Sequence, residues 1–511
     1  MIAGGAEFDS RNVDSALMNG NGVCFETERR SRTAPGGLSN IMKTTALRVA
    51  ILTMGCGLVL SHAHAQNLPL LAVGTLDESR AGAWADLSGL TYTLENGASA
   101  NLLGGFGSGM TYASGNTFLA LPDRGPNAIP FNSNVDDTVS YVNRFHTVHM
   151  KLKQNMSGTG LPYTLTPDLQ HTTLLWNLAP LVYGTGDGLG IGSGVPPINN
   201  ALQHYFTGRS DGFDADQNSG DPLNARFDTE GIRVSNDGER VYISDEYGPY
   251  VYEFDRETGM RLRSFTLPAS FYVSNVSPMG ATEISGNTSG RVANKGMEGL
   301  AITPDGRTLV GIMQNSLIQD ANQGGAAAKL LRIVTIDLAS GNVSHQFAYL
   351  LTTGSGVSEI LALNNHELLV DERDGKGRGD GSTAKVKQLF KIDLAGAVDV
   401  SQMDGAHAAL NAVPKALFVD LVTSLNAAQI TSGVIPAKIE GITFGPDLKQ
   451  KGKIVHTLWV ANDNDFLATA TDSKGNTIDN PNQFFVFGFT DVDLGGSTFV
   501  PQFGGGDDDE D

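Results

Sequence analysis

The chain has 511 residues, of which 62 are glycine and only 18% are charged. This composition favours many short strands joined by tight turns over long charged helices. The formal net charge of −20 repels nucleic acid and anionic surfaces but attracts cations. We therefore expect no nucleic-acid partner, and an anionic substrate would need a bound metal ion or local positive charge.

The first 65 residues do not have the pattern of a folded domain. Residues 1–41 are polar and unpatterned, as expected of a translation start placed upstream of the true one at Met42. Residues 42–65 have a basic start, an apolar run over 49–60 and a final Ala-His-Ala, which predicts a secretory signal peptide cleaved after about Ala65. The protein is thus expected to be periplasmic or secreted, with no membrane span.

The two cysteines, Cys24 and Cys56, both precede this expected cleavage site. A mature chain that begins near residue 66 would have no thiol, and it could form neither a disulfide nor a zinc–cysteine site.

One phrase recurs five times in the body of the chain. A short apolar strand opens on a Glu-Gly or similar pair, a tight turn follows, and a second apolar strand ends in acids or amides. The copies are Gly107–Asn127, Asp228–Leu267, Lys295–Asn315, Val357–Gly377 and Lys438–Phe466. An alternating third strand and a fourth follow the phrase, as in "VYEFD" and "LFKIDL".

Four strands in each of several repeats predict an all-β fold, a β-propeller with four-stranded antiparallel blades. The repeats give five blades, and a sixth remains open because the spacing is irregular. A β-sandwich is the structural rival, but it does not predict the same phrase at each step.

The strand at 68–76 has no blade of its own, so we expect it to pair with the last blade near "QFFVFGF" and close the ring. We predict a single, monomeric propeller domain over residues 66–500. Residues 501–511 contain the acidic run "DDDED" and are expected to form a disordered tail.

Acidic residues recur at one end of the predicted channel. The first strands carry Glu230, Glu298, Glu359 and Glu440, with Ser108 in the same place in the first repeat, and second strands end in Asp245-Glu246 and Asp371-Glu372. Like charges held close together raise one another's pKa unless a cation neutralises them. Oxygen ligands without Cys or His in the repeats suit calcium or a similar hard ion.

Basic residues accompany these acids: Arg124, Lys295, Arg373 and Lys438. They could form ion pairs with the acids, or they could bind a substrate anion such as phosphate beside a metal ion. The sequence leaves both interpretations open.

The phrases "LPDRGPN", "FDTEGIRVSNDGERVYISDEYGPYVYEFD", "NKGMEGLAITPDGRTL" and "LWVANDND" resemble the "esterase-like activity of phytase" family over about residues 70–490. This resemblance implies calcium-assisted hydrolysis of phosphoester or ester bonds in a small anionic substrate. Under it, the metal ligands would be Glu230, Asp245, Glu298, Glu359, Asp371 and Glu440. The anion would be bound by Arg124, Lys295, Arg373 and Lys438, with Glu246 or Glu372 as general acid or base.

Two features depart from this pattern: Ser108 replaces the glutamate of the first repeat, and the fourth has Glu-Ile instead of Glu-Gly. One of these positions is therefore expected not to bind metal. Two other functions fit the same pattern, a calcium-dependent lactonase or carboxylesterase and a non-catalytic ligand-binding propeller.

Overall fold

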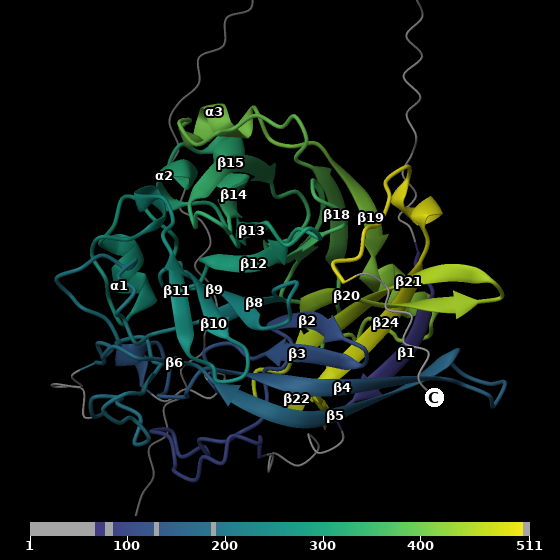
Figure 1. Ribbon diagram of the computed structural model, residues 1–511, viewed down its shortest axis with the longest axis horizontal. Coiled ribbons are helices and arrows are strands. Elements are labelled where there is room, and N and C mark those ends of the chain that lie inside the picture. The colour runs from purple at the N-terminus through teal and green to yellow at the C-terminus, as the bar shows by residue number, and fades with distance from the viewer. Residues whose placement is uncertain (1–66, 77–84, 127–131, 185–190, 504–511) are drawn as a thin grey trace, which may run out of the picture. The chain divides into compact units, whose positions relative to one another are not determined.

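The computed structural model describes residues 67–76, 85–126, 132–184 and 191–503 (Figure 1). The chain divides into two units, Met1–Ser61 and His62–Asp511, and every described residue belongs to the second. The expected upstream segment, signal peptide, cleavage site and acidic run lie outside the described residues. Within the described ranges, no helix has the length and apolar character needed to cross a membrane.

Five antiparallel four-stranded sheets form the blades of a β-propeller (Figure 1). Blade 1 has β2 (Gly109–Ser114), β3 (Thr117–Leu121), β4 (Arg144–Gln154) and β5 (Tyr163–Leu174); blade 2 has β8 (Thr229–Val234), β9 (Arg240–Asp245), β10 (Val251–Asp255) and β11 (Arg261–Phe265). Blade 3 has β12 (Met297–Ile302), β13 (Thr308–Met313), β14 (Leu330–Asp337) and β15 (Val343–Leu350); blade 4 has β16 (Gly356–Ala362), β17 (Glu367–Arg373), β18 (Lys387–Asp393) and β19 (Lys415–Asp420). Blade 5 has β20 (Lys438–Gln450), β21 (Lys453–Asp463), β24 (Gln483–Phe489) and β1 (Leu70–Thr75).

The remaining elements are short and lie between or beside the blades. Two small sheets pair β6 (Trp176–Asn177) with β7 (His204–Tyr205) and β22 (Thr469–Thr471) with β23 (Thr477–Asp479). The α-helices are α1 (Gly280–Ser285), α2 (Ile318–Ala321), α3 (Gly405–Ala409) and α4 (Leu421–Ala427), and the 3₁₀ segments are η2 (Ser133–Val135), η3 (Ala269–Phe271), η4 (Gly325–Lys329) and η5 (Asp491–Leu494).

The innermost strands make a closed ring in the order β2, β8, β12, β16, β20 and back to β2. β1 pairs with β24, with Leu70 opposite Phe487 and Thr75 opposite Gln483, so the chain's first described strand completes its last blade. This confirms the predicted ring closure and gives five blades rather than six. Closure leaves no open edge between the first and last blades.

The core lies between neighbouring blades. Inner strands such as β8 and β12 are buried at every residue, so their sequences do not alternate between apolar and polar residues as a half-exposed strand would. At the seam between blades 1 and 5, the rings of Phe118 and Trp459 lie 4.5 Å apart. Pairs of this kind add to the apolar burial that holds adjacent blades in register.

Candidate functional site

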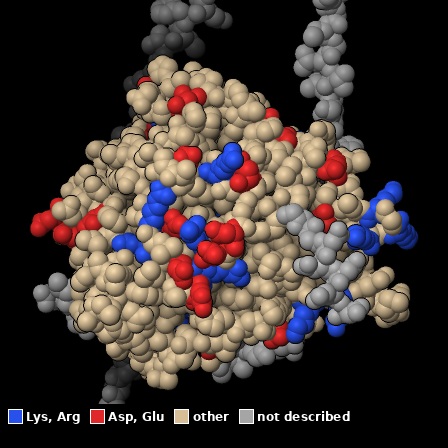
Figure 2. All heavy atoms as spheres, in the orientation of Figure 1, with Lys and Arg blue, Asp and Glu red and all other residues tan. Residues whose placement is uncertain are grey.

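A cleft of about 230 Å³ opens at one mouth of the channel, and we call it the central cleft. Figure 2 shows acidic and basic side chains gathered at the centre of this face. The lining residues are Ser108, Asp123, Arg124, Asp228, Glu230, Glu246, Asn294, Lys295, Glu298, Gln314, Arg373, Lys438, Glu440 and Asp463.

On three of the inner strands, one position supplies a cleft residue through a β-bulge or an equivalent irregularity. In blade 3 the pairing passes from Met297 opposite Met313 to Gly299 opposite Ile312, so Glu298 is left without a partner in the register. The same irregularity occurs at Glu230 in β8 and at Glu440 in β20. A bulge of this kind re-aims a side chain, and here it brings three glutamates to the cleft.

In blade 4 this position belongs to Ser358. The β16–β17 register shifts between Val357 and Glu359, and Glu359 itself pairs with Asp371. The alignment of Glu359 with the other three glutamates is therefore wrong by one residue. Because strand side chains alternate between faces, a shift of one residue directs Glu359 away from the cleft.

Glu359 lies inside the channel and pairs with a buried arginine. Its carboxylate accepts hydrogen bonds from the backbone N–H of Leu300 at 3.1 Å and of Ile360 at 2.9 Å. It also lies 2.9 Å from the guanidinium of Arg233, which bonds the carbonyl of Met110 on β2 and so crosses the ring. Burial raises the pKa of Glu359 to about 7 against the opposing effect of Arg233.

A second cleft position ends the second strand of each blade. Counting from the paired residues of each hairpin places Asp123, Glu246, Gln314, Arg373 and Asp463 at equivalent points. All five line the central cleft. The residues one step earlier in blades 2 and 4 are Asp245 and Glu372, and neither is among the lining residues.

The structure thus leaves three further predicted residues outside the cleft lining. Asp245 accepts the backbone N–H of Asp228 at 2.7 Å, and burial raises its pKa to about 7. Asp371 is 1% exposed, and burial raises its pKa to about 8. For Glu372, burial is outweighed by hydrogen bonds from Lys415 and the Thr353 N–H, which lower its pKa to about 2.

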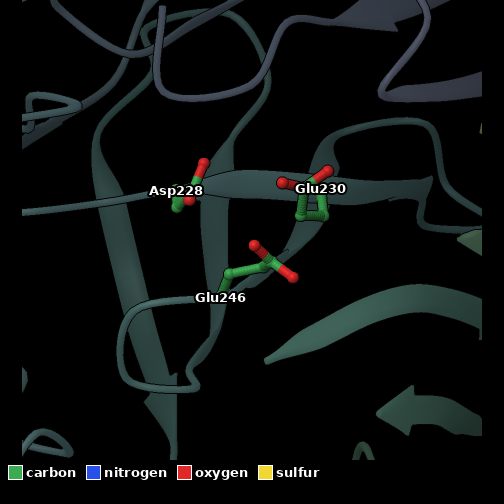
Figure 3. A group of neighbouring side chains, drawn as sticks. All are labelled: Asp228, Glu230 and Glu246. Carbon is green, nitrogen blue, oxygen red and sulfur yellow. The ribbon is translucent and has the colours of Figure 1, made fainter. Parts of the chain in front are cut away.

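Three carboxyl groups at the blade 2 side of the cleft converge. Asp228, Glu230 and Glu246 each offer one oxygen, and these oxygens lie within 4.8 Å of one another (Figure 3). We call this group the acidic triad. Asp228 was not singled out from the sequence, although it stands two residues before Glu230, the spacing that places two side chains on one face of an extended chain.

The cleft lining contains seven carboxyl groups and four cationic side chains. This excess of negative charge is expressed in the pKa values. Burial, then repulsion from neighbouring acids, raises the pKa of Glu230 and of Glu298 well above the ordinary glutamate value. Burial raises the pKa of Glu440 to about 7 although Arg373 and Lys438 oppose the shift.

The four cationic side chains differ in how fully they are paired. Lys438 Nζ lies 2.7 Å from Asp463, Arg124 lies 2.8 Å from Asp228, and Arg373 forms an ion pair with Glu440. Lys295 Nζ donates one hydrogen bond within the described residues, to the amide oxygen of Gln314 at 3.3 Å. Among the four, Lys295 is thus the one not joined to a carboxylate by an ion pair within the described part of the chain.

The lining residues suit a hard cation. They include carboxylates, amides and a hydroxyl but neither His nor Cys, and oxygen ligands of this kind are preferred by Ca²⁺ and Mg²⁺. At the blade 5 side, the ammonium of Lys438 lies between Asp463 and Asp465. Among the residues that the structure describes, the acidic triad forms an ion pair with Arg124 alone, so the residues present there fit an added divalent cation.

Similar solved structures share little with this chain. A putative 6-phosphogluconolactonase from Bacteroides uniformis is 12% identical, with a TM-score of 0.29 over 74% of this chain and 88% of its own. A luciferin-regenerating enzyme is 11% identical, with a TM-score of 0.30 over 80% of this chain and 98% of its own. Neither likeness is close enough to indicate a shared activity.

A closer sequence relative is an uncharacterized secreted protein of Arthroderma benhamiae, 33% identical over 144 residues. The match spans 26% of this chain and 28% of that relative's length. Residues 101–466 match the family described as "Phytase-like: Esterase-like activity of phytase". The match runs from the start of blade 1 to the end of the fifth repeat, and it confirms the resemblance read from the repeats. The chain belongs to the phytase-like family.

Proposed function

We propose that the protein is an exported hydrolase that uses a divalent cation, calcium in the first instance, to cleave phosphoester or ester bonds in the central cleft. The acidic triad carries this proposal, because three buried carboxylates within 4.8 Å of one another repel unless a cation lies between them. Family membership and the name of the secreted relative support hydrolysis and export.

The triad residues Asp228, Glu230 and Glu246 would hold the cation. A cation bound there would neutralise the triad, polarise the ester group and lower the pKa of a bound water. Lys295 would bind a non-bridging oxygen of the substrate, because it is not joined to a carboxylate by an ion pair. Arg373 would stabilise negative charge that develops on that group in the transition state.

Glu298 would take the proton of the attacking water. Its carboxyl accepts a hydrogen bond from the amide of Gln314 at 2.8 Å. Burial and then the neighbouring charge of Glu246 raise its pKa, which makes its carboxylate a stronger base. Water adds to phosphorus or to the acyl carbon, its proton passes to Glu298, and the alcohol leaves after receiving that proton. This exchanges the roles expected from the sequence for Glu246 and Glu298.

The charge of the cleft lining indicates whether the substrate is a phosphate ester or a carboxylate ester. The lining of the central cleft is mostly polar and carries four cationic groups, which favours a phosphate ester over an uncharged lactone. The lactonase and the non-catalytic binding protein remain outcomes of the test below.

The test measures turnover of p-nitrophenyl phosphate, phytate and p-nitrophenyl butyrate by the purified protein, with EDTA and then with added CaCl₂. We expect phosphate-ester cleavage that EDTA abolishes and calcium restores. Glu230→Gln should lose this activity, whereas Glu239→Gln, an exposed change in the same blade, should keep it. Cleavage of butyrate alone would favour the lactonase or carboxylesterase, and no cleavage of any of the three substrates would favour the non-catalytic binding protein. Activity that is indifferent to EDTA and calcium would refute the cation.

Export is tested separately. Sequencing the N-terminus of the protein recovered outside the cytoplasm should find a start near Gln66. A start at Met1 or Met42 in that fraction would contradict the signal peptide.

A further inference from the structure

Two serines hold positions where three other blades have glutamate. Ser108 in blade 1 and Ser358 in blade 4 are equivalent to Glu230, Glu298 and Glu440 in the strand register. The Ser358 hydroxyl accepts a hydrogen bond from Arg373 Nε and so helps to fix that guanidinium. The Ser108 hydroxyl is different: it lines the central cleft, its residue is 2% exposed, and its oxygen has no hydrogen-bond partner among the described residues.

Ser108 is held in place by the glycines on both sides of it. A Cβ at Gly107 would lie 2.3 Å from the backbone carbon of Asn462 on β21, and one at Gly109 would lie 2.2 Å from the carbonyl oxygen of Glu230 on β8. Any larger residue would therefore push blade 1 away from both neighbours. The Gly-Ser-Gly sequence packs closely between blades 5 and 2, so the backbone that carries Ser108 is fixed before any ligand binds.

An unpaired buried hydroxyl costs stability unless something bound to the protein pairs with it. Carboxyl groups that could accept from it, Asp123 and Glu440, line the same cleft, yet neither is hydrogen-bonded to it. A glutamate at this position would fill the blade 1 side of the cleft and add to its excess of negative charge. Serine instead leaves room there and presents a donor.

We propose that the Ser108 hydroxyl is a substrate-binding group that donates a hydrogen bond to an anionic oxygen of a phosphate ester held in the central cleft. The cationic side chains of Lys295, Arg373 and Lys438 line the same cleft and supply the attraction that places an anion there. This proposal rests on the proposed function for its substrate class. It assigns the blade 1 side of the cleft to the substrate and the blade 2 side to the cation.

The decisive measurement is calorimetric binding of inorganic phosphate to the calcium-loaded protein, which needs no turnover. Ser108→Ala should weaken phosphate binding about 10- to 100-fold, the usual range for a hydrogen bond to a charged group. Calcium affinity should stay within about twofold of the parent value, because Ser108 is not part of the triad. Unchanged phosphate affinity in Ser108→Ala would overturn the proposal.

Thermal unfolding separates a binding role from a structural one. Ser108→Ala removes a hydroxyl that has no partner, so its Tm should equal or exceed that of the parent. Ser358→Ala is the matched control at the equivalent position, and its Tm should fall because Arg373 loses an acceptor. A fall in Tm for Ser108→Ala as large as that of Ser358→Ala would make the hydroxyl structural and would refute the proposal.

Ser108→Glu distinguishes the two proposals from each other. The added carboxylate should abolish phosphate binding and strengthen calcium binding. If the parent binds phosphate and Ser108→Ala does not, the hydroxyl's role stands even where p-nitrophenyl phosphate is not cleaved, and only the hydrolase proposal fails. If Ser108→Glu binds phosphate as well as the parent does, the assignment of the blade 1 side to substrate is wrong.

Discussion

Blades 2 and 4 place side chains of different charge at the same two positions of the repeated hairpin. In blade 2 the bulge position and the strand-end position hold Glu230 and Glu246, whereas in blade 4 they hold Ser358 and Arg373. The backbone that presents these side chains is the same repeated hairpin. The difference shows that the propeller supplies a ring of equivalent positions, and that the residues placed there give blade 2 two carboxylates and blade 4 a guanidinium.

The largest effect should come from variants that distinguish the roles of Glu246 and Glu298 in the central cleft. Glu298→Gln is expected to lower kcat about 10²- to 10⁴-fold, the usual contribution of a general base, with calcium affinity retained. Glu246→Gln should instead weaken calcium binding, because it removes a member of the acidic triad. Steady-state kinetics at saturating calcium, with calcium titrations of both variants, checks this. The reverse pattern would restore the roles expected from the sequence.

The next effect concerns the ion pair between Arg233 and Glu359 inside the channel. Arg233→Met leaves Glu359 buried without its cation, which should lower the free energy of unfolding by about 3–5 kcal/mol. Adding Glu359→Gln removes the unpaired buried charge, so the double variant should recover part of the lost free energy of unfolding. Urea unfolding of the parent and the two variants measures both changes. A single variant as stable as the parent would mean that the pair contributes nothing.

Glu372 gives a smaller effect that depends on pH. Its pKa in the folded protein is about 2, below the ordinary value of about 4.3 for glutamate. The proton therefore binds the unfolded chain first as pH falls, and the stability that Glu372 contributes is present above about pH 4.5 and lost between about 4.5 and 2. The loss should be about 2 kcal/mol.

Unfolding at pH 6 and pH 3, compared between the parent and Glu372→Gln, isolates this contribution from that of the other acids. The difference between the two proteins should be full at pH 6, smaller at pH 3 and gone only as the pH falls below about 2, the folded pKa of Glu372. A difference that stayed constant across this range would show that the hydrogen bonds from Lys415 and Thr353 do not depend on the charge of Glu372.

The contrast between blades 2 and 4 also explains what the sequence could predict. The repeated strand–turn–strand phrase was enough to predict the blades, and the unassigned strand at Leu70–Thr75 indicated how the ring closes. Glu230, Glu298 and Glu440 were found because a glycine follows each one and marks the bulge. In blade 4 the phrase "SEIL" has no such glycine, so Glu359 was aligned where Ser358 belongs.

The residues that end the second strand of each blade were harder to predict, because they too depend on the pairing register. "SDEY" in blade 2 and "VDER" in blade 4 look alike, yet the register places Glu246 and Arg373 at equivalent points. A shift of one residue reverses which side chain faces the cleft, and composition carries no information about it. Pairing of whole hairpins is therefore needed to distinguish the lining residues from Asp245, Asp371 and Glu372.

The smallest predicted effect tests whether Lys295 also binds the substrate anion. Its Nζ is bonded to the amide of Gln314 at 3.3 Å rather than to a carboxylate, so Lys295→Met should leave the fold intact. The loss of one charge–charge contact with substrate should raise KM for a phosphate ester about tenfold, with kcat changed less. Lys376→Met, an exposed lysine of the loop after β17, is the control. If both variants keep the parent KM, Lys295 contributes only to the general field of the cleft, and the anion is bound through Arg373 and Ser108 alone.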